Sequence, residues 1–240
     1  MEKIAMEKGP IRPPSEAQSL LIRATRNCPW NKCAFCHTYQ GHKFKLRTVE
    51  EISDDIRKAK RIAERIRDIS RLDGSDGRVS QSVVKRVCDE GEFAEESIRS
   101  IAAWLYHGCE SVFIQDADSM IMKTDDLVQV ICFIRETFPE VRHITSYCRS
   151  KTAAYKSLAD LERLHDAGLT RIHVGLESGS DPVLRFMNKG VTAAEQVEGG
   201  TKIEGSGFIS LYLCDARTWR QELVQGACPG DRQGDQPDKP

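Results

Sequence analysis

Short apolar runs recur along the second half of the chain at an interval of about thirty residues. A stretch with apolar residues at helical spacing separates each run from the next. This alternation indicates strands joined by helices, which is typical of βαβ units and a parallel sheet. The predicted strands are 111–116, 142–147 and 171–177, with another starting near 208 and an earlier one within the run SLLIRAT that begins at Ser19.

Helix signals lie between these strands and ahead of them. Thr48 and Glu51 form a capping-box pattern, as do Thr192 and Glu195, and Gly168 is placed to end a helix. The segment from 70 to about 92 begins with a Gly, Asp and Ser mixture without a period, which predicts an inserted loop. The predicted helices are 49–68, 93–107, 125–137, 152–167 and one that follows Thr192.

The pattern therefore predicts an α/β protein with a parallel sheet, either doubly wound or a partial (β/α) barrel. In both architectures ligands collect at the carboxyl ends of the strands. The residues just after each apolar run are accordingly the candidate binding residues.

Charge and composition give little further direction. The 35 Lys and Arg residues nearly balance the 36 Asp and Glu residues, so nothing indicates a nucleic acid or an anionic membrane as partner. The amino-terminal stretch is polar and interrupted by prolines, and no apolar run reaches about eighteen residues. We therefore expect a cytoplasmic protein.

Three of the nine cysteines, Cys28, Cys33 and Cys36, stand on one short segment directly after the first predicted strand. Three thiolates there could hold zinc, an iron–sulfur cluster, or a c-type haem through Cys33, Cys36 and His37. The haem interpretation requires export, and zinc requires a fourth ligand, for which only His37 or His42 is near. A cluster with three cysteines leaves one iron open to a small molecule.

Polar residues follow the other predicted strands. Gln115, Asp116 and Asp118 follow the strand at 111, Arg149 follows the next, and Glu177 and Ser178 follow the one after it. Each carboxylate could equally cap a helix or bind backbone amides at a strand end, so both interpretations remain open for each residue.

The cysteine segment resembles that of the radical SAM superfamily, whose pattern is C-x3-C-x-φ-C with φ aromatic. Phe35 occupies the aromatic position, and four residues rather than three separate Cys28 from Cys33. HVGLESGSD at 173–181 is similar to a segment of the branch with oxygen-independent coproporphyrinogen oxidases and methylthiotransferases. The resemblance spans about residues 19 to 213.

The resemblance implies a partial barrel in which Cys28, Cys33 and Cys36 hold a [4Fe–4S] cluster whose open iron chelates S-adenosylmethionine. It implies an enzyme that cleaves this cofactor reductively to a 5′-deoxyadenosyl radical, with an electron donor such as flavodoxin or ferredoxin and an unspecified substrate. The cofactor-binding residues would be Gln115, Asp116, Asp118, Arg149, Glu177 and Ser178, with Arg149 pairing with the cofactor carboxylate.

Two alternatives accompany this interpretation: a non-catalytic module that binds zinc or a cluster, and an inactive truncated fragment. The expected organisation is an amino-terminal extension (1–18), a radical SAM core (19–213) and an aberrant or disordered tail (214–240). Because the superfamily's usual core has six strand units and the pattern stops after the fifth, we hypothesise a frameshift near residues 211–214.

Overall fold

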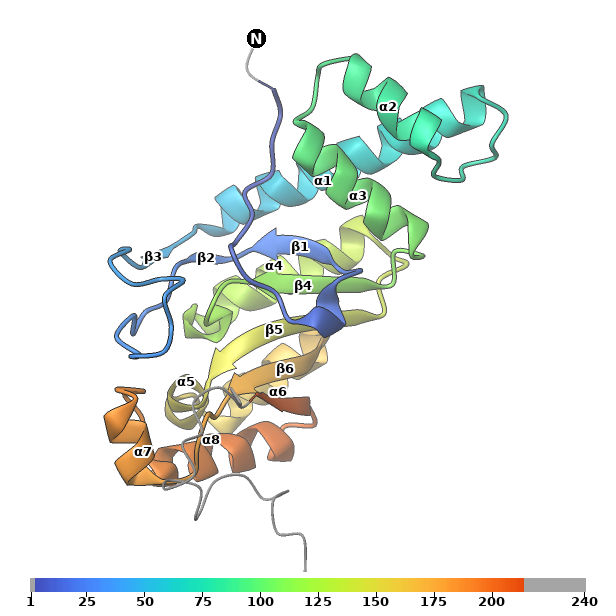
Figure 1. The fold of residues 1–240 in the computed structure, drawn as a ribbon. Coiled ribbons are helices and arrows are strands. Elements are labelled where there is room, and N and C mark those ends of the chain that lie inside the picture. The colour runs from blue at the N-terminus through green and yellow to red at the C-terminus, as the bar shows by residue number, and fades with distance from the viewer. Residues whose placement is uncertain (1–2, 214–240) are drawn as a thin grey trace, which may run out of the picture.

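The computed structural model describes residues 3–213, and its centre is a five-stranded parallel sheet (Figure 1). The strand order is β1-β4-β5-β6-β7, so each strand after β1 is added on the same side of its predecessor. Right-handed crossovers of this kind build an open, partial barrel, as predicted. The strands are β1 (Leu20–Arg23), β4 (Ser111–Gln115), β5 (His143–Arg149), β6 (Leu169–Gly175) and β7 (Ile209–Leu213).

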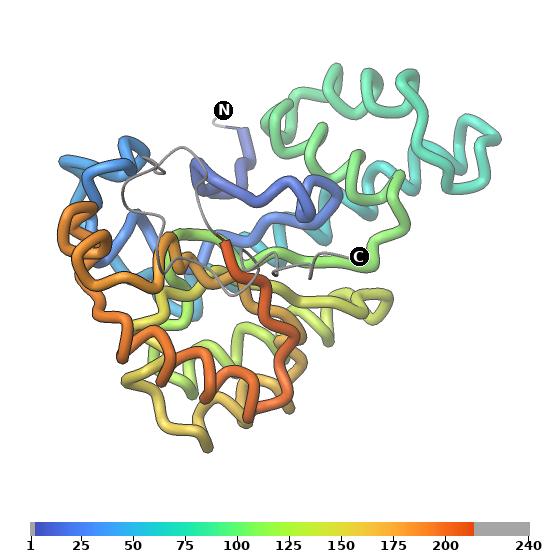
Figure 2. The backbone as a smooth tube through the Cα atoms, turned by 60° about the horizontal axis from the view of Figure 1, so that its bottom comes forward, coloured from blue at the N-terminus to red at the C-terminus, as the bar shows by residue number. Residues whose placement is uncertain are grey.

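Helices gather along one face of the sheet, and the amino-terminal segment runs over the other face (Figures 1 and 2). Alternate strand residues such as Ile22, Ile114 and Ile172 are buried in the core shared with the helices. The opposite face carries the contacting rings of Phe113 and Tyr147. The main helices are α1 (Val49–Leu72), α3 (Glu95–Tyr106), α4 (Thr124–Thr137), α6 (Leu158–Ala167) and α8 (Ala193–Gly205).

Helix α1 follows directly from its sequence. The capping box is present, with Thr48 Oγ1 accepting from the Glu51 amide and the Glu51 carboxylate accepting from the Thr48 amide. The isoleucines and alanines at helical spacing are fully buried, and the helix continues four residues past the predicted end at 68. This amphipathic stripe fixes α1 against β1 and α4.

The predicted loop over about 70–92 is partly wrong, because it contains a further helix, α2 (Gln81–Asp89). Ser80 caps it, with its Oγ accepting from the Val83 amide at 3.3 Å. Val83 and Val87, one helical turn apart, are completely buried beside α1. Val83, Val84, Val87 and Cys88 are spaced as on one helical face, but a helix of nine residues is marginal by itself, and packing against α1 stabilises it.

The predicted helix over 152–167 is instead two helices, α5 (Ser150–Tyr155) and α6. Lys156 and Ser157 adopt extended backbone angles between them, and Ser157 Oγ accepts from the Asp160 amide as the cap of α6. Lys156 Nζ then donates to the Met122 carbonyl oxygen and to Thr124 Oγ1. The break lets a lysine reach the loop after β4.

Shorter elements join these parts. They are η1 (Pro14–Glu16), β2 (Thr25–Arg26), β3 (Lys45–Leu46), η2 (Ser119–Ile121) and α7 (Asp181–Phe186), and β2 pairs with β3 in a separate two-stranded sheet. Residue 4 pairs with residue 93, so the predicted extension 1–18 packs on the sheet and on α3 where it is described.

Within the described residues β7 pairs only with β6 and therefore forms one edge of the sheet. Its residues Ile209 and Tyr212 are 54% and 40% exposed, so this edge strand carries apolar side chains that the described residues leave partly uncovered. The prediction of an aberrant tail at 214–240 lies outside the described residues, and so does residue 214 of the hypothesised frameshift region at 211–214.

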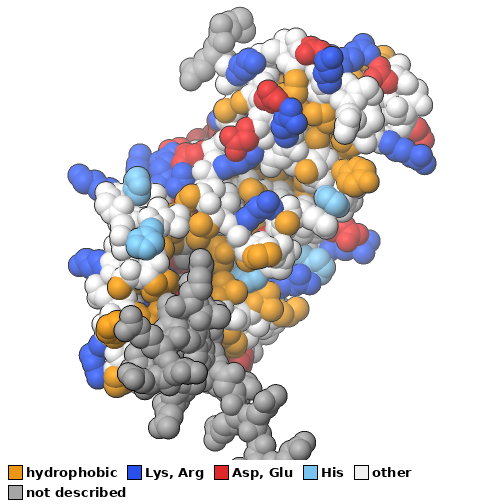
Figure 3. Space-filling view, viewed as in Figure 1, with side chains coloured by type: hydrophobic (Ala, Val, Ile, Leu, Met, Phe, Trp, Pro, Cys, Tyr) orange, Lys and Arg blue, Asp and Glu red, His pale blue; other side chains and the backbone are white. Residues whose placement is uncertain are grey.

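The surface carries charges of both signs. Figure 3 shows Lys, Arg, Asp and Glu side chains intermixed on the viewed face around α1 to α3. Several of them pair across helices, for example Arg65 with Glu90 and Arg61 with Glu92. No helix in the described part is long and apolar enough to cross a membrane.

Candidate cofactor site

The segment that carries the three cysteines, residues 27–44, connects β2 to β3 and lies at the carboxyl edge of the sheet (Figure 1). We call it the cysteine loop. Cys28, Cys33 and Cys36 are free thiols, each half-buried. The Asn31 amide donates to Cys28 Sγ at 3.4 Å, a hydrogen bond that stabilises a thiolate at that position.

The cysteine loop is docked on the turn that follows α7. Trp30 Nε1 donates to the Asn188 carbonyl oxygen at 2.7 Å, and Asn188 Nδ2 donates to the Lys32 carbonyl oxygen at 2.9 Å. The Ala34 amide donates to the Met187 carbonyl oxygen at 2.9 Å. Three hydrogen bonds thus hold two segments more than 150 residues apart in the sequence.

Two cations lie beside the loop. Lys189 Nζ is 3.0 Å from Glu177 Oε1 in a buried ion pair and 5.5 Å from the centre of the Phe35 ring. Arg149 Nη2 donates to the Lys189 carbonyl oxygen at 3.0 Å, and its guanidinium lies 5.5 Å from the centre of the Trp30 ring. The end of β5 and the turn after α7 therefore bring positively charged side chains to the cysteine loop.

The positive charges of Lys189 and Arg149 act on the Cys33 thiol. Burial raises the pKa of Cys33, the Lys189 charge and the more weakly acting Arg149 charge lower it, and the neighbouring Cys28 raises it again. The cations thus offset part of the desolvation cost of a thiolate, which is the form that binds metal.

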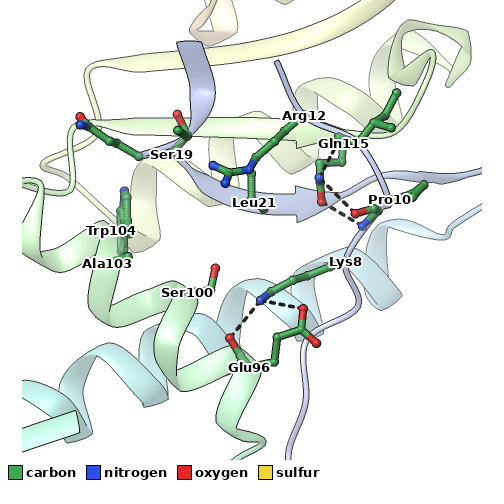
Figure 4. A pocket seen from close by; sticks show the side chains of 14 residues that line it. Lys8, Pro10, Arg12, Ser19, Leu21, Glu96, Ser100, Ala103, Trp104 and Gln115 are labelled. Carbon is green, nitrogen blue, oxygen red and sulfur yellow. Dashed lines mark hydrogen bonds and ion pairs between the residues drawn. The ribbon is translucent and has the colours of Figure 1, made fainter. Parts of the chain in front are cut away.

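Gln115 lies on the strand face opposite the helices. There both the oxygen and the nitrogen of its side-chain amide form hydrogen bonds with the backbone of the amino-terminal segment (Figure 4). Its Oε1 accepts from the Gly9 amide at 2.9 Å, and its Nε2 donates to the Ile11 carbonyl oxygen at 2.9 Å. Beside it, a cavity of about 320 Å³ lies between this segment, β1 and α3, lined among others by Lys8 and Trp104.

Asp116 is completely buried, and its carboxylate is surrounded by donors from the protein. Arg23 Nη2 donates to Oδ2 at 2.7 Å, the Asn27 amide donates to the same oxygen at 3.0 Å, and Tyr39 Oη and the Ala117 amide donate to Oδ1. Its side chain is therefore engaged with the cysteine loop and β1.

Asp118 is also completely buried. Its Oδ2 accepts from Thr152 Oγ1 at 2.5 Å and its Oδ1 from the Arg149 amide at 3.3 Å, so it ties the loop after β4 to the start of α5. Burial raises the pKa of Asp118 to about 6, although the hydrogen bond from Thr152 and the charge of Arg149 act in the opposite direction.

This raised pKa predicts a pH dependence of stability. Between the ordinary value of 3.8 and about 6, the folded state holds a proton on Asp118 that the unfolded state has lost. The contribution of Asp118 to the free energy of unfolding therefore falls as pH rises through this window, by on the order of 3 kcal/mol.

The measurement compares the wild-type chain with Asp118→Asn by urea unfolding at pH 4 to 7. Because asparagine does not titrate, the wild type should lose stability relative to the variant as pH rises. A difference between the two proteins that stays constant over this range would contradict the assignment.

Glu177 and Ser178 follow β6 and are buried. Glu177 adopts a left-handed backbone conformation with φ of 65°, which a residue other than glycine takes only where its surroundings fix it. Ser178 Oγ accepts from the Ser180 amide at 3.1 Å, and its carbonyl oxygen accepts from Gln196 Nε2 at 3.0 Å. These bonds hold the backbone turn that presents Glu177 to Lys189.

The donor set fits an iron–sulfur cluster better than a single ion. Among the described residues no three His, Cys, Asp or Glu side chains are grouped closely enough to share one metal ion. A [4Fe–4S] cluster does not require such convergence, because each thiolate binds a different iron. Cys28, Cys33 and Cys36 could hold three irons and leave the fourth without a protein ligand.

Sequence reasoning missed several residues of this site. Lys189 and Trp30 are not among the candidates that the sequence pattern identifies, although a lysine followed by glycine after a short helix is a detectable pattern. His173 on β6 is buried with its Nε2 3.4 Å from Glu16 Oε1, and its Nδ1 has no hydrogen-bond partner among the described residues.

Comparisons with known proteins identify the family of the chain. The family model described as the radical SAM superfamily matches residues 83–215, more than half of the chain. No curated protein matches the chain. The chain therefore belongs to the radical SAM superfamily, whose enzymes use a [4Fe–4S] cluster and S-adenosylmethionine.

Two solved structures are similar in fold. The cobalamin-dependent S-adenosylmethionine radical enzyme OxsB with aqua-cobalamin bound is 15% identical with a TM-score of 0.50, over 80% of this chain and 23% of that chain. HydG, a maturase of the [FeFe]-hydrogenase, is 12% identical with a TM-score of 0.49, over 92% of this chain and 37% of that chain. The chain thus spans well under half the length of either protein.

Proposed function

We propose that this chain binds a [4Fe–4S] cluster through Cys28, Cys33 and Cys36 and cleaves S-adenosylmethionine reductively. The observation that carries the proposal is the docking of a loop with three free thiols at the carboxyl edge of the sheet, beside the cations of Arg149 and Lys189. When bound, the cluster and cofactor supply a 5′-deoxyadenosyl radical that abstracts hydrogen from a substrate.

The residues of the chain would bind the cofactor and hold the loops around it. We assign Arg149, with Lys189 beside it, to the carboxylate of the cofactor, because a positive charge at that place both binds the anion and stabilises the Cys33 thiolate. Glu177 and Ser178 form the neighbouring wall. Since the amide of Gln115 and the carboxylates of Asp116 and Asp118 already bond to the protein, we assign these three residues to holding the surrounding loops.

The cluster needs one electron from outside the chain for each cleavage. A small redox protein such as flavodoxin or ferredoxin is the proposed donor. The cysteine loop lies at the edge of the sheet and its cysteines are only half-buried, which leaves a short path from the surface to the cluster.

Anaerobic reconstitution of the whole chain with iron and sulfide tests the proposal. We expect uptake of one cluster per chain and, after reduction with dithionite, formation of methionine and 5′-deoxyadenosine from S-adenosylmethionine. Stoichiometric zinc binding without cluster uptake would contradict it and support a non-catalytic module. Cluster uptake without cleavage of the cofactor would support an inactive fragment.

A further inference from the structure

The carboxylate of Asp116 bonds to the cysteine loop at two points, one before and one after its three cysteines. Its Oδ2 accepts from the backbone amide of Asn27, the residue directly before Cys28, at 3.0 Å. Its Oδ1 accepts from the hydroxyl of Tyr39, three residues after Cys36. One buried side chain thus bonds to the loop on both sides of its cysteines.

We propose that Asp116 is a positioning residue that closes the cysteine loop through Asn27 and Tyr39 and so presets the three thiols for the cluster. The inference deepens the proposed function and rests on it. It differs from the role that the family resemblance implied for Asp116, because the contact is made to the loop and not to the cofactor.

Arg23 fixes the orientation of the carboxylate. Its guanidinium donates to Asp116 Oδ2 through Nη2 at 2.7 Å and through Nε at 3.1 Å, and its Nη1 donates to Glu7 Oε1 at 3.1 Å. This pairing compensates the charge of a side chain with no exposed surface. Since Arg23 is the last residue of β1, the rigid sheet determines where the carboxylate points.

The Tyr39 hydroxyl donates its hydrogen bond to the Asp116 carboxylate. Tyr39 is only 2% exposed although it belongs to a loop, and both burial and the hydrogen bond to Asp116 raise its pKa. A hydroxyl whose pKa is raised stays protonated at neutral pH and can donate to the Asp116 carboxylate. The Tyr39 carbonyl oxygen in turn accepts from the His42 amide at 3.0 Å, which continues the ordering into the rest of the loop.

The Asn27 end is constrained as well. Asn27 has a left-handed backbone with φ of 69°, and its Nδ2 donates to the Lys43 carbonyl oxygen at 2.7 Å. A loop whose ends are held loses less conformational entropy when its thiolates bind, so the loop binds a cluster more tightly. Residues that hold metal ligands in place typically contribute on the order of ten- to hundredfold in metal affinity.

Tyr39→Phe tests this inference with the smallest change, since it removes one hydroxyl and keeps the ring. Tyr106→Phe is the matched control, because Tyr106 is 71% exposed at the end of α3, by the amino end of β4. Two quantities are measured: the rate of iron loss from reconstituted protein to a chelator, and hydrogen exchange of the Asn27 amide in the apoprotein. Thermal unfolding of the apoprotein is recorded alongside.

We expect Tyr39→Phe to lose iron at least about tenfold faster than the wild type and the control. We also expect it to exchange the Asn27 amide faster, with little change in the unfolding temperature. Unchanged iron loss together with unchanged exchange would overturn the proposal. A large drop in the unfolding temperature that accounts for the faster iron loss would also overturn it, since Tyr39 would then support the fold in general.

The hydrogen-exchange measurement on the apoprotein can test the role of Asp116 even if the proposed function is wrong. If the wild-type chain takes up no cluster, the proposed function fails, whereas protection of the Asn27 amide in the apoprotein still decides whether Asp116 closes the loop. Asp116→Asn provides a second variant, in which the same amide should lose protection because a neutral acceptor binds the amide more weakly. Full protection of the Asn27 amide in Asp116→Asn would overturn the assignment.

Discussion

Replacing Cys33 by alanine should abolish cluster binding and cleavage of S-adenosylmethionine. Three thiolates are the whole protein contribution to the proposed cluster, so losing one leaves a second iron without a protein ligand. Cys33 is the thiol on which the Lys189 and Arg149 charges act. We expect the iron and sulfide content after reconstitution to fall at least about tenfold, and formation of 5′-deoxyadenosine to fall to background.

Cys132→Ala is the matched control for this prediction. Cys132 is an exposed free thiol on α4, and its loss should leave iron content and cofactor cleavage at the wild-type level. If Cys33→Ala retained a full cluster, or if Cys132→Ala lost it to the same extent, the assignment of the ligands would be wrong.

Gly190→Ala should undock the cysteine loop and sharply reduce cluster binding. Gly190 has φ of 69°, and a β-carbon at this position would lie 2.3 Å from the ring of Trp30. Alanine there carries a backbone cost of about 1–2 kcal/mol in the left-handed region. The clash with the indole adds about 1–3 kcal/mol, which the protein relieves by moving Trp30 and the loop attached to it.

A second glycine separates the clash from the backbone strain. Gly91 has a similar φ of 74° but no atom within 4 Å of the position a β-carbon would take. We therefore expect Gly91→Ala to lower the free energy of unfolding slightly and to leave cluster content unchanged. Equal cluster content in the two variants would refute the claim that the turn after α7 holds the cysteine loop. Urea unfolding of the apoproteins and iron analysis after reconstitution are the measurements.

The strands and most helices were predictable because their signals are local. The apolar runs at 111, 142 and 171 and the capping boxes at Thr48 and Thr192 all correspond to observed elements. Helix α2 and the break at Lys156 were missed. Both depend on tertiary contacts, the first with the preceding helix α1 and the second with the loop after β4.

The candidate site, like the fold, could be predicted from the sequence only in part. Spacing identified the three cysteines as candidate ligands, since cysteines at close intervals on one loop are typical of metal or cluster sites. Whether a polar residue after a strand faces the cofactor or the protein depends on the register of neighbouring segments. Gln115 and Asp116 were candidates because of their position at the end of a predicted strand, and their side chains bond to the amino-terminal segment and the cysteine loop.

The sequence by itself determined the parallel α/β architecture and placed three cysteines on one short segment, because periodicity and spacing are properties of short segments. Only the tertiary structure decided what surrounds those cysteines. Lys189 and Asn188 lie more than 150 residues from Trp30 and Lys32, and the folding of the sheet brings them together at its carboxyl edge. Long-range contacts of this kind place charge beside the thiols and hold the loop, and no pattern within one segment encodes them.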